Sequence, residues 1–73
     1  MIEVRFFATL RDGRGKVMQV DAEKAAVAGD ILRLCDIKPE EVSILLINGF
    51  HSKPEDPVKD GDVISLFPPV GGG

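Results

Sequence analysis

The chain has 73 residues, 44% hydrophobic and 29% charged, a composition typical of one small globular domain and not of a disordered chain. Its net charge of −3 argues against nucleic acid or an anionic membrane as its main partner, since both attract clustered Lys and Arg. One cysteine, Cys35, excludes an internal disulfide or a multi-cysteine zinc site and indicates a reduced, cytoplasmic protein. Charges interrupt the N-terminal apolar stretch and no apolar run approaches the ~20 residues of a membrane span, so we expect neither a signal peptide nor an anchor.

Two extended runs open the chain and predict a β-hairpin. Residues 2–7 (IEVRFF) alternate between the two sides of an extended chain, with Phe7 on the outward side, which is typical of a half-buried strand. A second run covers residues 16–20. Between them, Gly13 and Gly15 can adopt the positive φ of a turn.

The middle of the chain, from about residue 25 to residue 35, changes to a helical period. Its apolar positions share one predicted helix face: Val27, Ile31, Leu34 and Cys35. Gly29 costs this helix about 1 kcal/mol relative to Ala, so burial of the apolar face has to stabilise it. Pro39 ends the helical segment. On this face Cys35 is expected to be a buried small hydrophobe and not a nucleophile.

The second half of the chain predicts three more strands. Their expected positions are residues 43–47, a short edge strand at 50–52, and residues 63–67. The pair Asn48-Gly49 favours a tight turn after the first of them. His51 has no second histidine or cysteine near it in the sequence, so we expect a surface residue and not a metal ligand.

This order of elements predicts an α+β fold of the β-grasp (ubiquitin-like) kind. One helix would pack across one face of a mixed sheet of four to five strands, with the first and last strands as central neighbours. Periodicity alone would also permit a split ferredoxin-like half or another small α+β sheet. We expect residues 1–67 to form the domain and residues 68–73 a flexible C-terminal tail.

The predicted tail reads Pro68-Pro69-Val70-Gly71-Gly72-Gly73, with two stiff residues at its exit and three residues without a Cβ at its end. Six extended residues reach about 20 Å, enough to enter a narrow channel on another protein. The distinctive reactive group would be the Gly73 carboxylate, which needs activation, for instance by adenylation. The chain has no phosphate-binding glycine loop, so we expect no bound cofactor and ATP use by a separate activating enzyme.

Several segments resemble the MoaD/ThiS family of ubiquitin-like sulfur carriers, most closely the small subunit of molybdopterin synthase. They are the opening MIEVRFFA, the Asn48-Gly49 turn, DGDV at residues 60–63 and LFPPVGGG at residues 66–73. The resemblance therefore spans the whole chain.

The resemblance implies a carrier without catalytic side chains. An E1-like enzyme would adenylate Gly73, and a donor such as a cysteine desulfurase or rhodanese-like protein would supply sulfur for a C-terminal thiocarboxylate. The large subunit of the synthase would then take the sulfur for molybdopterin, the precursor of the molybdenum cofactor. The tail would occupy a partner channel through Pro68, Pro69, Val70, Gly71 and Gly72. Phe7 and Phe67 would form part of the partner interface, although both could instead be core residues.

The sequence is also compatible with other functions. The same carrier chemistry would serve thiamine, tungsten-cofactor, cysteine or tRNA-thiolation pathways. In a different class, the chain would be a ubiquitin-like modifier or an interaction domain. The basic residues near the first turn could steer an acidic partner, but a solvated hairpin tip explains them equally well. They are Arg11, Arg14 and Lys16.

Overall fold

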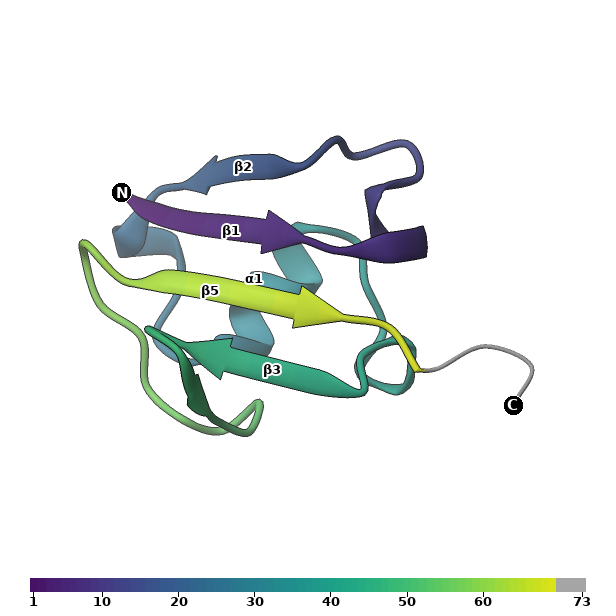
Figure 1. Cartoon of the computed structure of the whole chain (residues 1–73). Helices are drawn as coiled ribbons and strands as arrows, with labels where there is room; N and C mark the ends of the chain where they lie inside the picture. The colour runs from purple at the N-terminus through teal and green to yellow at the C-terminus, as the bar shows by residue number, and fades with distance from the viewer. Residues whose placement is uncertain (70–73) are drawn as a thin grey trace.

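A computed structural model describes residues 1–69 and shows one mixed sheet with a helix across one of its faces (Figure 1). The strands are β1 (Ile2–Phe6), β2 (Val17–Val20), β3 (Ile44–Ile47), β4 (Phe50–His51) and β5 (Val63–Phe67), and the helix is α1 (Ala28–Leu34). The five strands lie in the order β2-β1-β5-β3-β4. β1 and β5 pair in parallel at the centre and the other pairs are antiparallel. The predicted β-grasp arrangement is confirmed.

The core lies between the sheet and α1. Side chains on the inward side of the two central strands are completely buried: Ile2, Val4, Phe6, Ile64 and Leu66. They pack against the buried side of the helix, which includes Ile31, also 0% exposed. Because strand side chains alternate between faces, each outward neighbour of these residues is left on the opposite side of the sheet. The expected burial of Cys35 is confirmed as well.

The helix is shorter than the sequence predicts, and its buried face is different. The Asp30 carboxylate accepts hydrogen bonds from the backbone N–H groups of Ala26 and Val27, at 2.9 and 3.2 Å, so α1 begins only at Ala28. The residues that face the core are Ala28, Ile31, Leu32 and Cys35. The expectation for Leu34 is wrong, because this side chain lies on the flank of the helix and is 43% exposed.

Gly29 has a packing role that the sequence does not reveal. Its N–H donates to the Pro54 carbonyl oxygen at 2.8 Å, and a Cβ built on Gly29 would lie 3.3 Å from that same oxygen. The loop before β5 therefore approaches the helix backbone closely. A second hydrogen bond, from the Ala28 N–H to the Asp56 carbonyl oxygen at 2.9 Å, holds the same loop against the start of α1.

The connection between β1 and β2 is more elaborate than a tight turn. A 3-10 helix, η1 (Ala8–Arg11), precedes the glycine-containing segment. Arg14 is not a simple solvated tip residue, because its guanidinium donates to the carbonyl oxygens of Leu10, Cys35 and Asp36 at 3.0–3.3 Å. It thereby ties this connection to the C-terminal end of α1, where carbonyl groups lack partners within the helix. Two further 3-10 helices are η2 (Ala22–Lys24) and η3 (Pro39–Glu41).

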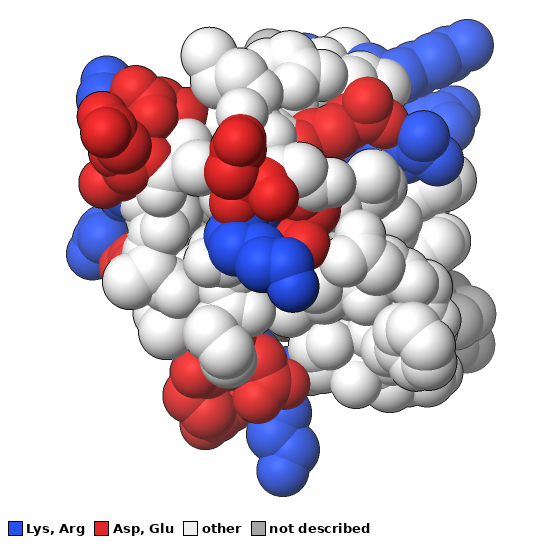
Figure 2. Space-filling view, turned by 90° about the vertical axis from the view of Figure 1, so that its left-hand side faces the viewer, with Lys and Arg blue, Asp and Glu red and all other residues white. Residues whose placement is uncertain are grey.

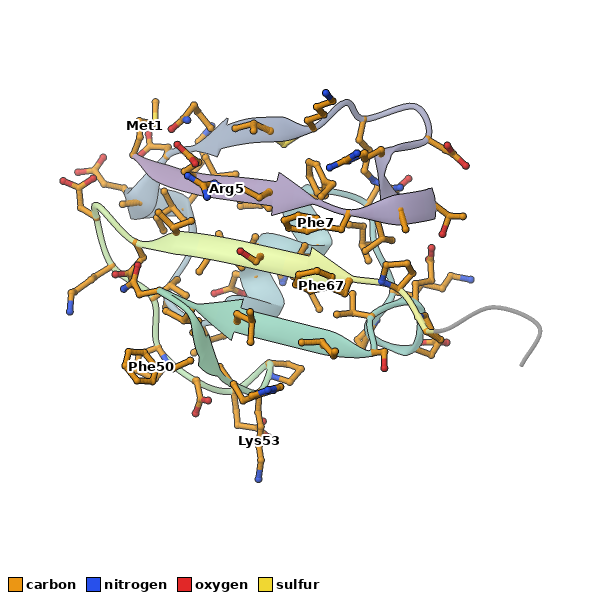
Figure 3. All side chains as sticks on the ribbon, in the orientation of Figure 1. Met1, Arg5, Phe7, Phe50, Lys53 and Phe67 are labelled. Atoms are coloured by element: carbon orange, nitrogen blue, oxygen red, sulfur yellow. The ribbon has the colours of Figure 1, made fainter. Side chains whose placement is uncertain are left out.

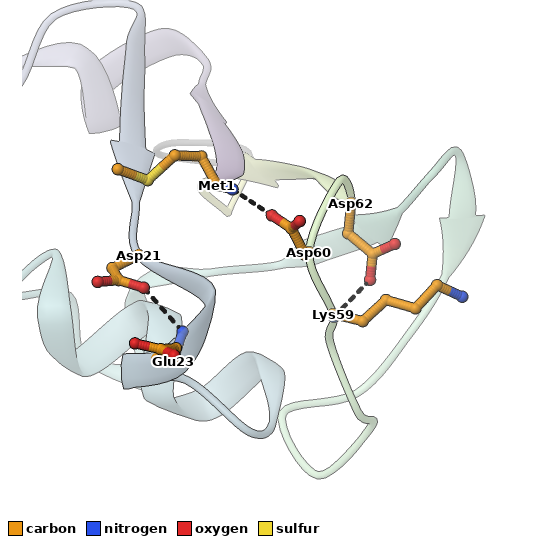
Figure 4. Close-up of polar contacts among 6 residues, drawn as sticks. All are labelled: Met1, Asp21, Glu23, Lys59, Asp60 and Asp62. Atoms are coloured by element: carbon orange, nitrogen blue, oxygen red, sulfur yellow. Dashed lines mark hydrogen bonds and ion pairs between the residues drawn. The ribbon is translucent and has the colours of Figure 1, made fainter.

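Polar contacts organise the end of the molecule at which β1 begins (Figure 4). Asp62 is only 5% exposed, and its carboxylate accepts hydrogen bonds from the Lys59 N–H and the Asn48 Nδ2, both at 2.9 Å. Asn48 also accepts one from the Val63 N–H at 2.9 Å, so the predicted turn at Asn48-Gly49 is fastened to the start of β5. Figure 2 views this end and shows Asp and Glu side chains in groups beside Lys and Arg.

Candidate functional site

The candidate site lies on the sheet face opposite α1, at the end where β5 finishes (Figure 3). Phe7 extends β1 by one residue, with φ −125° and ψ 151°, and its N–H donates to the Leu66 carbonyl oxygen at 3.1 Å. This continues the parallel register that pairs Phe6 with Leu66, and so brings Phe7 beside Phe67. The two rings stack with centroids 4.3 Å apart and an interplanar angle of 9°. Both side chains are partly exposed.

Arg11 adds a third layer to this stack. Its Cζ lies 5.5 Å from the centroid of the Phe7 ring, and its Nε donates to the Phe6 carbonyl oxygen at 2.9 Å. A guanidinium over an aromatic face is attracted by the ring quadrupole. The backbone hydrogen bond fixes Arg11 in that position, so the Phe7 ring is held between a cation and the Phe67 ring.

Two residues of β3 extend the apolar surface beyond the predicted pair. Ile44 is paired with Phe67 and Leu46 with Ser65, which places both side chains on the same face as the aromatic stack. Ile44 is 38% exposed and Leu46 is partly exposed. We call Phe7, Ile44, Leu46 and Phe67 the tail-side patch.

The rest of this sheet face is more polar. Towards the start of β1, Arg5 and Glu3 form an ion pair through the Arg5 Nε. The exposed Val17, paired with Arg5, and the partly exposed Val63, paired with Glu3, also lie on this face, whereas the two aromatic rings lie together near the end of β5. We therefore take the tail-side patch as the candidate surface for contact with another protein.

The backbone at the end of β5 is fixed on both sides. The Ser43 N–H donates to the Phe67 carbonyl oxygen at 2.8 Å, while the Phe7 N–H donates to the Leu66 carbonyl oxygen at 3.1 Å. Pro68 and Pro69 follow, and neither has an N–H to continue pairing with a neighbouring strand. Pro68 is partly exposed and Pro69 exposed, so the chain leaves the sheet directly beside the tail-side patch. Val70, Gly71, Gly72 and Gly73 lie outside the described residues, and their assigned roles stay predictions.

The remaining candidates do not form a second chemical site. Burial raises the pKa of the Cys35 thiol, only partly opposed by the Arg14 charge, which favours the unreactive protonated form. His51 is exposed on β4. Within residues 1–69 no three His, Cys, Asp or Glu side chains are placed to hold a metal ion, and no helix there is long and apolar enough to cross a membrane.

The five-stranded mixed sheet with the α-helix α1 across one face defines a small protein with a ubiquitin-like fold. Residues 4–73 match the ThiS family. The chain belongs to this family of ubiquitin-like sulfur carriers, which are carrier or modifier proteins and not catalytic enzymes.

Individual relatives agree with this assignment. Small archaeal modifier protein 3 of Haloferax volcanii is 32% identical, with 99% of this chain and 98% of the relative aligned. The crystal structure of SAMP1 from Haloferax volcanii superimposes with a TM-score of 0.78 and 28% identity over 99% of this chain and 98% of its own. A protein from Helicobacter pylori, solved in a complex of subunits 1 and 2 of molybdopterin-converting factor, gives a TM-score of 0.66 and 29% identity over 99% and 97%.

Proposed function

We propose that this chain carries sulfur as a thiocarboxylate on Gly73. The observation that supports the proposal most strongly is the position of the tail-side patch, directly beside the point where Pro68 and Pro69 leave the sheet. A protein that docks on this patch would receive the following residues at its own active site. The match to the ThiS family continues through Gly73, so the residues that would be delivered belong to the family pattern.

The chemistry proceeds in two steps. The Gly73 carboxylate attacks the α-phosphorus of ATP, which forms an acyl-adenylate and releases pyrophosphate. A sulfur nucleophile then attacks the acyl carbon and AMP leaves with the bonding electron pair. When the sulfur comes from a persulfide on the donor, reduction of the remaining S–S bond by a thiol frees the thiocarboxylate. Activation is required because a free carboxylate would have to expel oxide.

Partner proteins perform these steps. An E1-like enzyme binds ATP and adenylates Gly73, and a cysteine desulfurase or rhodanese-like protein supplies the sulfur. Pro68, Pro69, Val70, Gly71 and Gly72 occupy the partner's channel, while Phe7 and Phe67, together with Ile44 and Leu46, form the docking surface. Because these steps consume ATP and reduced sulfur, we place them in the cytoplasm.

We further propose that the sulfur goes to molybdopterin, for the molybdenum cofactor, through a synthase large subunit. The complex of subunits 1 and 2 in the Helicobacter pylori relative supports this choice. Thiamine, tungsten-cofactor, cysteine and tRNA-thiolation pathways are the competing destinations. Incubating the thiocarboxylated chain with each candidate acceptor system, and assaying its sulfur-containing product, separates them.

Intact mass spectrometry tests the carrier function. The chain is incubated with candidate E1-like enzymes, ATP and a sulfur donor. The expected product is heavier by the exchange of one oxygen atom for sulfur. Deletion of Gly72 and Gly73 serves as the control and abolishes the gain. A chain that forms neither the adenylate nor the thiocarboxylate with any of these enzymes is not a carrier.

A modifier function is the second candidate, because the 32% identical relative is named as a small archaeal modifier protein. In that reaction a lysine Nζ of a target protein attacks the acyl-adenylate and forms an isopeptide bond to Gly73 as AMP leaves. Cleavage of conjugates at lysine and arginine would yield target peptides whose modified lysine carries residues 60–73 of this chain, because Lys59 is its last basic residue. Activity that survives deletion of Gly72 and Gly73 would instead assign the function to the domain surface.

A further inference from the structure

The outer edge of β2 presents backbone groups that its partner β1 does not use. β2 lies at one edge of the sheet, the upper edge in Figure 1. The Phe6 N–H donates to the Lys16 carbonyl oxygen at 2.9 Å just before β2 begins. Hydrogen-bonded pairs alternate with non-bonded pairs along an antiparallel ladder. The register of Arg5 with Val17 and Glu3 with Gln19 therefore makes these the non-bonded pairs, so the N–H and C=O of Val17 and Gln19 point to the open edge.

This edge lacks the usual protection against strand addition. The sequence of β2, VMQV, has no proline and no charge, and Val17 is 50% exposed. Edge strands that avoid pairing are typically very short or carry Pro or Lys. The opposite edge fits that description, since β4 has only two residues. Of the two edges, β2 is the one suited to pairing.

We propose that β2 pairs antiparallel with β2 of a second copy of this chain, about a two-fold axis at Met18. Val17 of one copy then faces Gln19 of the other, and each facing pair exchanges two N–H···O=C hydrogen bonds. In this register the N–H and C=O groups of Val17 and Gln19 in each strand all form hydrogen bonds with the other copy. The hydrogen bonds between β1 and β2 stay intact.

The charges that flank β2 select a second copy over an unrelated strand. The exposed Lys16 precedes β2 and the exposed Asp21 follows it, so the edge is positive at one end and negative at the other. Antiparallel pairing of such a strand with itself places Lys16 of each copy opposite Val20 of the other copy, one residue before that copy's Asp21, whose carboxylate also accepts a hydrogen bond from the Glu23 N–H at 2.9 Å. The positive end of each strand therefore lies beside the negative end of the other. Parallel pairing would oppose like charges at both ends.

The dimer leaves the tail-side patch free. β1 separates β2 from β5, and the patch belongs to β3, β5 and the residue after β1. The two-fold axis places the ends of the two β5 strands at opposite ends of a continuous sheet. The inference therefore does not depend on the proposed function. Since one short edge buries far less than the roughly 1,200–2,000 Å² of a stable interface, we expect a reversible dimer that forms on concentration.

Nuclear magnetic resonance and sedimentation across a wide concentration range test the pairing. The Val17 and Gln19 amide signals are expected to shift with concentration as the sedimentation coefficient rises. Gln19→Pro removes one outward N–H that β1 does not use, a position where an edge strand tolerates proline, and should abolish both changes without unfolding the chain. The matched control, Phe50→Lys on the opposite edge, should retain them.

Two variants with reversed charges test the same pairing without a proline in β2. Lys16→Glu alone and Asp21→Lys alone should each be monomeric, because each places like charges together across the axis. An equimolar mixture of the Lys16→Glu and Asp21→Lys variants should form a heterodimer, because each end of the paired strands then again holds one positive and one negative side chain. A wild-type chain that remains monomeric at high concentration overturns the proposal. The β2 edge would then be available to pair with a strand of another protein. Dimerisation with shifts at the tail-side patch and none at β2 also overturns it.

Discussion

Leu66 and Phe67 are consecutive residues with different tasks. Leu66 is 0% exposed in the core, whereas Phe67 is partly exposed in the tail-side patch. Leu66→Ala should lower the free energy of unfolding by about 2–5 kcal/mol, because it removes buried methyl groups and leaves a cavity. Denaturant unfolding measures this loss. A cost well below this range would mean that the core relaxes around position 66.

Phe67→Ala should instead act on recognition. It removes an aromatic contact of about 0.5–1.5 kcal/mol and part of the docking surface, so stability should fall less than for Leu66→Ala. The dissociation constant for the activating enzyme should rise at least about tenfold, as for an anchor residue at an interface. Isothermal titration calorimetry measures this change. Unchanged affinity would remove Phe67 from the interface.

Asp62 is a buried polar residue whose contribution is structural. Asp62→Ala leaves the Lys59 N–H and the Asn48 Nδ2 without their acceptor, at a cost of about 1–3 kcal/mol. Thermal unfolding, with Asp60→Ala as the control, tests this expectation. The control should have a much smaller effect, because the ion pair of Asp60 with the Met1 amino group is exposed.

Asp30 determines where the helix α1 begins. The backbone N–H groups of Ala26 and Val27, with the nearby Arg33 charge, hold the pKa of Asp30 below its usual value. A lowered folded-state pKa stabilises the protein above the unfolded-state pKa, and this stabilisation disappears as the pH falls through the lower folded-state value. Asp30→Asn should therefore destabilise the chain at neutral pH and progressively less below pH 3.8, the ordinary aspartate value.

Thermal unfolding of wild type and Asp30→Asn from neutral to acidic pH measures that difference directly. Asp60 also has a lowered pKa, from its contact with the amino terminus, but it is present in both proteins and its effect cancels in the comparison. A difference that stays constant across the whole range would show that the Asp30 charge is not involved.

Some elements are predictable from the sequence because local chemistry determines them. Alternation in residues 2–6 identifies the inward side of β1, and Asn48 and Gly49 adopt the expected positive φ values of 53° and 86°. Leu34 is mispredicted because helical period alone does not say where the helix begins. The Asp30 hydrogen bonds and the close approach of Pro54 to Gly29 involve contacts that periodicity does not specify.

The candidate site is predictable only in part, for a similar reason. Phe7 and Phe67 follow from strand alternation combined with family resemblance. Ile44 and Leu46 lie in the run ILLI, whose uniform apolarity gives no sign of which side chains face outward. Only the β3–β5 register places them beside Phe67. The pairing of Val17 with Arg5, which exposes the β2 edge, is also a matter of register and not of composition.

In the molecule as a whole, folding and chemistry belong to different segments. The core cluster lies entirely within residues 2–66, and the proposed reactive carboxylate is on Gly73. Deletion of Gly72 and Gly73 should therefore leave the unfolding temperature unchanged while it abolishes activation by the E1-like enzyme. Calorimetry, together with an assay of pyrophosphate release, measures both. A large fall in unfolding temperature would contradict this separation.

The proposed function requires that sulfur be loaded on Gly73 and nowhere else. After incubation with the activating enzyme, ATP and sulfur donor, cleavage at lysine releases a C-terminal peptide that begins at Asp60, and tandem mass spectrometry locates the modification. We predict an exchange of oxygen for sulfur at the Gly73 carboxyl group. An added sulfur atom in the peptide that contains Cys35, removable by a reducing agent, with Gly73 unchanged, would instead make Cys35 the sulfur-carrying residue.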